Sequence, residues 1–161
     1  MKTNLKMKQY LDSLIKIESI NNFIIDFSKL ESIIFPKFIE WDGCVLLSQE
    51  RDIVLPSHFL PNQFTSDRTA FEADYNHIHL NDFFDEVISS DVILNIGTKI
   101  LQVWAAVLYK QYNGRRKFML ILSCDGEEVV LRFYTLRENE VPWLDTSKLE
   151  SYFDGLMLIE I

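Results

Sequence analysis

The stretch KFMLILSCDGEEVVLRFYTL, residues 117–136, decides the fold class of this sequence. Asp125 and Gly126 form a turn signal between two runs that are rich in β-branched and aromatic residues, which is the pattern of a β-hairpin. The first run is almost wholly apolar and predicts a central strand. In the second run, Val129, Leu131 and Phe133 alternate with other residues, which is typical of a half-buried strand.

A long amphipathic helix is predicted immediately before this hairpin, over residues 91–112. Its start has three candidate caps in Ser89, Ser90 and Asp91, and Asn113-Gly114 is a helix-ending pair. Gly97 inside the helix predicts close packing against a neighbour. One helical stripe carries most of the large apolar residues, namely Ile93, Ile96, Ile100, Leu101, Trp104, Val107, Leu108 and Tyr112.

The rest of the chain predicts shorter elements. Residues 7–15 have the apolar spacing of a helix, whereas residues 21–35 fit a helix or a strand. Asp42-Gly43 predicts a turn, with strands at CVLL (44–47) and DIVLP (52–56). Residues 146–153 predict a helix with a Ser147–Glu150 capping box, and LMLIEI (156–161) predicts a last strand. We therefore expect one α+β domain over 1–161, an antiparallel or mixed sheet with the long helix on one face.

Composition limits the classes of partner. The 161 residues are 48% hydrophobic and carry a formal net charge of -8. This charge disfavours nucleic acid and anionic membrane surfaces, and it suits a basic protein partner. Cys44 and Cys124 are 80 positions apart without a zinc-ligand pattern, which indicates buried free thiols. With no secretory signal and no apolar run of about 18 residues, we expect a cytoplasmic chain without a membrane span.

The segment FEADYNHIHLNDFF, residues 71–84, contains the most suggestive histidines. On a strand, His77 and His79 would point the same way and reach one metal ion, with Asp82 as a third ligand. Further ligands are scarce, because His58 is the only other histidine. We therefore expect no metal or other cofactor here. The chain also has no nucleophile elbow and no glycine-rich phosphate loop, so we expect no enzymatic activity.

Acidic residues are unevenly distributed. Residues 72–91 contain six acids and no Lys or Arg, and residues 138–161 contain six acids and one lysine. They form either two separate solvated faces or one negative face that steers a cationic partner. Trp143 is either an interface anchor or a side chain that fixes its loop to the core. Our candidate partner-binding residues are Glu72, Asp74, Asp82, Asp85, Glu86, Glu138, Glu140 and Trp143.

Three segments together resemble immunity proteins of bacterial polymorphic-toxin systems, which bind and neutralise a cognate toxin. They are YNHIHLNDFF (75–84), VWAAVLYKQYNGRRKFMLILS (103–123) and VVLRFYTLRENEVPWLD (129–145). The resemblance covers roughly residues 71–145 and implies a cytoplasmic, non-catalytic inhibitor of a toxin, which in many such systems is a basic nuclease. Two alternatives remain open, a metal-dependent hydrolase that uses His77 and His79, and a small acidic chaperone or adaptor for a secreted client.

Overall fold

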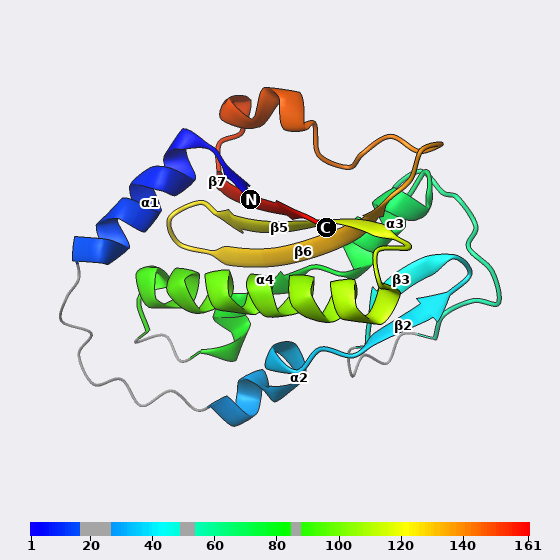
Figure 1. Cartoon of the computed structure of the whole chain (residues 1–161), viewed down its shortest axis with the longest axis horizontal. Helices are drawn as coiled ribbons and strands as arrows, with labels where there is room; N and C mark the ends of the chain where they lie inside the picture. Colours follow the sequence, from blue (N-terminus) through cyan, green and yellow to red (C-terminus); the bar gives the residue numbers. More distant parts are fainter. Residues whose placement is uncertain (17–26, 49–53, 85–87) are drawn as a thin grey trace.

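The computed structural model describes residues 1–16, 27–48, 54–84 and 88–161 (Figure 1). Its helical elements, in chain order, are α1 (Leu5–Lys16), η1 (Phe27–Leu30), α2 (Glu31–Ile34), α3 (Arg68–Tyr75), η2 (Leu80–Phe83), α4 (Ser90–Tyr112) and η3 (Thr146–Ser151). Its strands are β1 (Lys2–Thr3), β2 (Phe38–Trp41), β3 (Cys44–Leu47), β4 (Ile78–His79), β5 (Lys117–Cys124), β6 (Val129–Leu136) and β7 (Gly155–Glu160).

The main sheet is antiparallel and has the strand order β1-β7-β5-β6-β4. The predicted hairpin forms its centre, because β5 pairs with β6 over eight residue pairs and with β7 on the other side. The connection is longer than a two-residue turn and spans residues 125–128. Asp125 Oδ1 closes this connection by accepting from the amides of Glu127 and Glu128, both at 2.8 Å.

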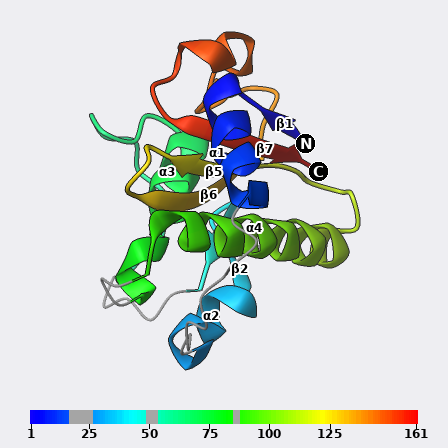
Figure 2. The same cartoon turned by 90° about the vertical axis from the view of Figure 1, so that its left-hand side faces the viewer.

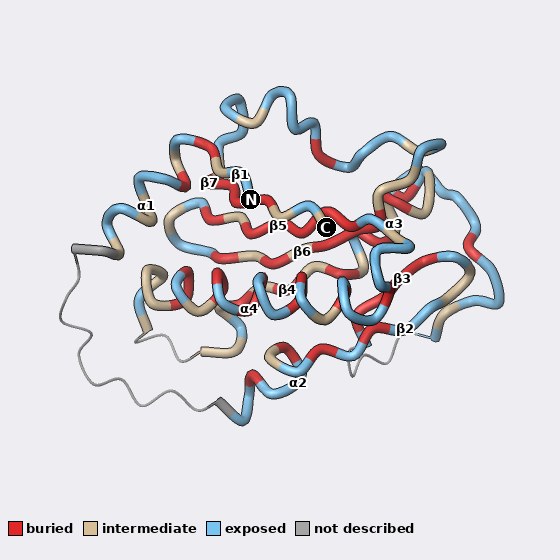
Figure 3. Tube along the Cα trace, in the orientation of Figure 1, coloured by how far each residue is buried: buried red, intermediate tan, exposed pale blue. Residues whose placement is uncertain are grey.

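Two layers cover the main sheet. The helix α4 packs across one face, as the sequence predicts, and α1 lies beside it over β7 (Figure 2). The segment 137–154, which includes η3, covers the opposite face (Figures 1 and 2). There Leu144 packs with Met119, Ile121 and Tyr134. Buried residues are concentrated in β5, β6 and the sheet side of α4, whereas segment 137–154 is largely exposed (Figure 3). The chain is therefore α+β, with the predicted long helix on one face.

The α4 helix begins and ends close to its predicted bounds. Ser89 occupies the N-cap position without a side-chain hydrogen bond, and Asn113 ends the helix in the left-handed conformation, with φ of 49°. By length and composition α4 could cross a membrane, with a mean hydropathy of 1.5. Half of that window is buried, and Trp104 and Leu108 are inaccessible, so α4 packs as a core helix.

Four local predictions require correction or comment. Segment 21–35, which fitted a helix or a strand, is helical over residues 27–34, in η1 and α2. The strand that pairs with β3 is β2, before the Asp42-Gly43 turn, rather than residues 52–56. Of those residues, 54–56 are not in a strand and 52–53 lie outside the described ranges. The Ser147–Glu150 capping box is also absent, because Asp145 accepts from the Ser147 amide while Glu150 accepts from the Leu5 amide.

Gly97 lies at the closest approach of α4 to the sheet. A Cβ atom there would stand 2.9 Å from Leu80 Cδ1 and 3.0 Å from Leu122 Cδ1. We expect Gly97→Ala to lower the free energy of unfolding by about 1 kcal/mol. Overpacking costs roughly 1–3 kcal/mol, which exceeds the helix-propensity gain of about 1 kcal/mol. Urea denaturation measures the change in the free energy of unfolding. The control is Gln102→Ala, on the exposed side of α4. A higher free energy of unfolding for Gly97→Ala would contradict this packing.

Candidate partner-binding surface

The α3 helix connects the two sheets through a row of buried polar side chains. Asp67 caps its start, with Oδ1 accepting from the Ala70 amide at 2.7 Å. Thr69, Glu72 and Asn76 recur at spacings of three and four residues, so they share one side of the helix and its C-cap. All three are buried, although polar side chains usually face water. Their burial requires internal hydrogen-bonding partners.

Those partners are backbone groups at the open edges of β3 and β6. Glu72 accepts from the amide of Val45 at 2.6 Å and from the amide of Thr135 at 2.5 Å. Asn76 accepts from the Leu47 amide at 2.8 Å and donates to the Val45 carbonyl at 2.9 Å. Two side chains thereby supply bonds that a neighbouring strand would supply in a continuous sheet. The β2–β3 hairpin is held to the main sheet in this way.

Arg137, just after β6, neutralises the buried Glu72 carboxylate. Its two Nη atoms donate to the two carboxylate oxygens at 2.7 and 3.0 Å, a bidentate pair, and Nη2 also donates to the Gly43 carbonyl at 3.0 Å. Burial acts to lower the pKa of Arg137, but the hydrogen bonds and charge of Glu72 outweigh burial and raise that pKa. Burial and, secondarily, the Glu72 charge raise the pKa of the neighbouring Cys44 thiol to about 12. Cys44 is therefore a neutral thiol inside the protein.

Glu72 therefore does not belong to a surface, and its assignment as a partner-binding residue is corrected. Its side chain is 0% exposed and bonded on both oxygens. The two predicted acidic segments do meet at this point, because Glu140 Oε2 lies 3.8 Å from Arg137 and accepts from the Thr69 amide at 2.8 Å. Glu140 thereby fixes loop 137–144 to the first turn of α3.

A second arginine brings Asp74 and Trp143 together. The Arg132 guanidinium lies 4.3 Å from the centre of the Trp143 ring and donates to the Ala73 carbonyl, one residue before Asp74. Burial lowers the pKa of Arg132, and the charge of Asp74 opposes that effect. Trp143 remains 44% exposed, so one side of its ring rests on Arg132 while the rest faces solvent. This geometry gives the loop a fixed aromatic side chain at the surface.

The other predicted acids are more scattered. Asp82 is exposed in η2, near the far end of the β5–β6 hairpin, and Glu138 is exposed in the turn after β6. Asp85 and Glu86 lie outside the described residues. The surface that the structure assembles from the predicted set therefore consists of Asp74, Glu138 and Trp143, with Glu140 as its anchor.

The two neighbouring histidines have structural contacts. Their rings meet edge to face with centroids 5.2 Å apart. The Nδ1 atom of His77 donates to the Asp74 carbonyl, and that of His79 donates to Glu128 Oε1 at 2.5 Å. Within the described ranges, no group of three or more His, Cys, Asp or Glu side chains is arranged to hold a metal ion. Both imidazoles therefore have hydrogen-bonding partners within the protein.

Sequence reasoning missed the two arginines that organise this region. Arg132 and Arg137 lie in and just after a strand, where they resemble ordinary solvent-facing residues. The available signal was the spacing of Thr69, Glu72 and Asn76, which forms a polar row along one side of the helix and its C-cap. Such a row indicates buried hydrogen bonds, and a buried carboxylate requires a cation.

Comparison with known proteins gives a family but no described relative. The family model described as "Uncharacterized protein PM0498 family" matches residues 2–161. No curated protein and no solved structure gives a significant match.

The Glu72–Arg137 pair predicts a strong energetic coupling. We expect Glu72→Gln alone to lower the free energy of unfolding by about 3 kcal/mol, because it removes the bidentate carboxylate from the buried Arg137 guanidinium and leaves only Glu140, at 3.8 Å. Adding Arg137→Met should restore part of that loss, giving a double-mutant coupling of at least about 1 kcal/mol in urea denaturation. Asp74→Ala, an exposed change on the same helix, should stay within about 0.5 kcal/mol. A coupling near zero would show that the pair does not anchor the hairpin.

Proposed function

The chain belongs to the Uncharacterized protein PM0498 family, and we propose that it is a non-catalytic inhibitor of the immunity type. In this proposal it acts in the cytoplasm, where it binds a cognate toxin with a basic surface and neutralises it. The resemblance of residues 71–145 to immunity proteins supports the toxin as partner. The observation that carries protein binding is the exposed, immobilised Trp143 beside exposed acidic residues.

Trp143 has the properties of an interface anchor. Tryptophan is enriched among the residues that contribute most to protein–protein binding, because it buries a large apolar area and keeps a polar edge. Its contact with Arg132, at 4.3 Å, fixes the ring before any partner arrives. A side chain that is already ordered loses less conformational entropy on binding. The loop that carries it is also tied to α3 through Glu140.

Charge supports a cationic partner. Asp74 and Glu138 are exposed, and the chain as a whole carries a net charge of -8. The arginines closest to this surface are engaged within the protein, Arg137 by Glu72 and Arg132 under Trp143. Negative potential at the surface accelerates association with a basic protein and disfavours acidic ones.

The chaperone alternative predicts a different partner for the same surface. An acidic adaptor would bind a secreted client and keep it competent for export without abolishing its activity. One measurement therefore distinguishes the two functions, namely whether the partner loses its activity when the complex forms. No contact within the described residues favours the adaptor over the inhibitor.

Co-expression tests the inhibitor function. The candidate partner is the product of a toxin-like gene next to the gene for this chain. We expect co-expression to restore growth of cells that produce this toxin, and we expect Trp143→Ala to weaken binding at least about tenfold in titration calorimetry, the loss typical of an anchor residue. The absence of such a gene, or toxicity that persists despite a soluble complex, would contradict the proposal.

Tyr109→Ala provides the matched control for Trp143→Ala. Tyr109 is also an exposed aromatic residue, but it lies on α4, which packs on the opposite face of the sheet from segment 137–154. We expect Tyr109→Ala to leave affinity unchanged, with circular dichroism and thermal unfolding confirming that both variants fold. Equal losses for the two variants would show that Trp143 is not an anchor.

The metal alternative predicts a distinct outcome. If His77 and His79 bound zinc in the folded chain, zinc would stabilise the native state by mass action. Because a zinc site needs three or four protein ligands and the described residues place no group of three or more such side chains together, we expect zinc to leave the melting temperature unchanged. Differential scanning fluorimetry with and without a chelator measures this. A zinc-dependent rise that His79→Ala abolishes would favour the hydrolase.

A further inference from the structure

We infer that the partner-binding surface extends across α3 onto the loop formed by residues 54–66, and that Leu60 and Phe64 are its second set of apolar contacts. The partner that fits is a protein with a basic patch flanked by two apolar contacts. This inference rests on the proposed function, because it assumes that Trp143 contacts a protein. It adds a segment that contains none of the candidate residues identified from sequence.

Loop 54–66 presents large apolar side chains to solvent. Leu60 is 74% exposed and Phe64 is 83% exposed. Phe64 lies in a hydrogen-bonded turn, because Asn62 Oδ1 accepts from the amides of Phe64 and Thr65 at 2.8 and 3.0 Å. Thr65 next to it is buried, so the turn is fixed to the protein while the phenyl ring faces outward. Exposed apolar groups of this size, when clustered, mark interaction sites.

The base of this loop is fixed to the β2–β3 hairpin by Asp42. The Asp42 carboxylate accepts from the Phe59 amide at 2.8 Å and from Arg68 Nη2 at 2.8 Å. The Phe59 amide and, next, Arg68 hold the pKa of Asp42 below its usual range. The Phe59 ring is buried against Phe71 of α3, with ring centroids 5.6 Å apart. The exposed side chains therefore project from an anchored segment.

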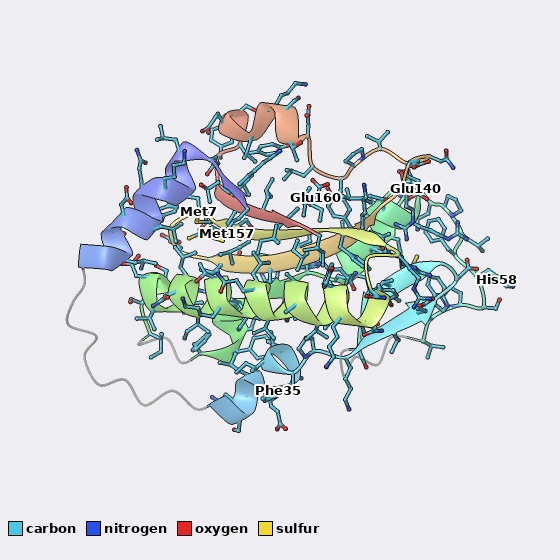
Figure 4. All side chains as sticks on the ribbon, viewed as in Figure 1. Met7, Phe35, His58, Glu140, Met157 and Glu160 are labelled. Atoms are coloured by element: carbon cyan, nitrogen blue, oxygen red, sulfur yellow. The ribbon has the colours of Figure 1, made fainter. Side chains whose placement is uncertain are left out.

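The two loops lie on opposite flanks of α3 at one end of the molecule. Phe59 and Arg68 tie loop 54–66 to one side of the helix. Glu140 ties loop 137–144 to its first turn on the other side. Figure 4 shows the two loops at this end, marked by His58 on one and Glu140 on the other. The exposed residue Asp74 lies on α3 itself, the helix to which both loops are tied.

Charge complementarity identifies the kind of partner. Residues 54–76 and 137–145, together with Arg132, contain six acidic residues, one of them the buried Glu72, and three arginines, a net of minus three. Each arginine already has a partner within the protein, because Arg68 pairs with Asp42, Arg137 pairs with Glu72 and Arg132 lies against the Trp143 ring. Acidic groups between two apolar loops match a partner whose cations lie between two apolar contacts.

Site-specific photo-cross-linking tests the extent of the surface. The probe is a catalytically inactive variant of the toxin-like protein encoded beside the gene for this chain. Phe64→p-benzoyl-phenylalanine and Trp143→p-benzoyl-phenylalanine should each cross-link to it, whereas Tyr109→p-benzoyl-phenylalanine on α4 should not. Mass spectrometry of the products should place both cross-links on one basic region of the probe.

The outcomes separate the inference from the proposed function. Cross-linking at position 143 without cross-linking at 64 overturns the extended surface and leaves the proposed function standing. Failure at both positions, with no complex in size-exclusion chromatography, overturns both. Cross-linking at 109 in place of 64 places the partner on the other face and also overturns the inference.

Affinity measurements provide an independent readout. We expect Leu60→Ser combined with Phe64→Ser to weaken binding of the same probe by about tenfold or more. Both side chains are largely exposed, so the melting temperature should stay unchanged. Leu5→Ser, at an exposed apolar residue in the first turn of α1, is the matched control and should retain full affinity. Full affinity of the double variant would overturn the extended surface.

Discussion

The structure depends on the hydrogen bonds that two side chains of α3 make to open strand edges. Among the described residues, the edge of β6 has no strand beside it beyond β4, and the β2–β3 hairpin presents a second open edge. Buried backbone groups at such edges require partners. Glu72 and Asn76 satisfy groups on both edges at once, and Arg137 compensates the carboxylate charge. A helix therefore replaces a strand between the two sheets.

The α3 helix has structural contacts on its inward side and holds the two surface loops on its flanks. Its inward side carries Thr69, Glu72 and Asn76, which hold the hairpin and β6 together. Its flanks hold loop 54–66 through Arg68 and loop 137–144 through Glu140. Two loops that are far apart in sequence are thus fixed relative to one another by eight residues of helix. This arrangement explains how exposed apolar side chains can be kept in defined positions outside regular structure, which is what a preorganised interface requires.

The sequence predicted some elements well because their signals are local. The 117–136 hairpin and the 91–112 helix follow from short-range alternation, helical periodicity and end residues. The capping box failed because Glu150 bonds to the Leu5 amide, a residue 145 positions away. Glu72 was misassigned for the same reason, since a carboxylate in an acidic segment resembles a solvated residue. Its burial depends on Arg137, which is 65 positions later.

By itself, the sequence determined the α+β class, the central hairpin, the long helix and the acidic character that favours a basic partner. These depend on residue type and spacing along the chain. Tertiary structure alone decided which acids are buried, which arginines neutralise them and which loops share a surface. Those properties arise from contacts between distant segments, because the burial and the neighbouring charges of an ionisable side chain depend on the groups that pack against it. Glu72 and Asp74, two positions apart, accordingly differ completely in role, one inside the protein and one at its surface.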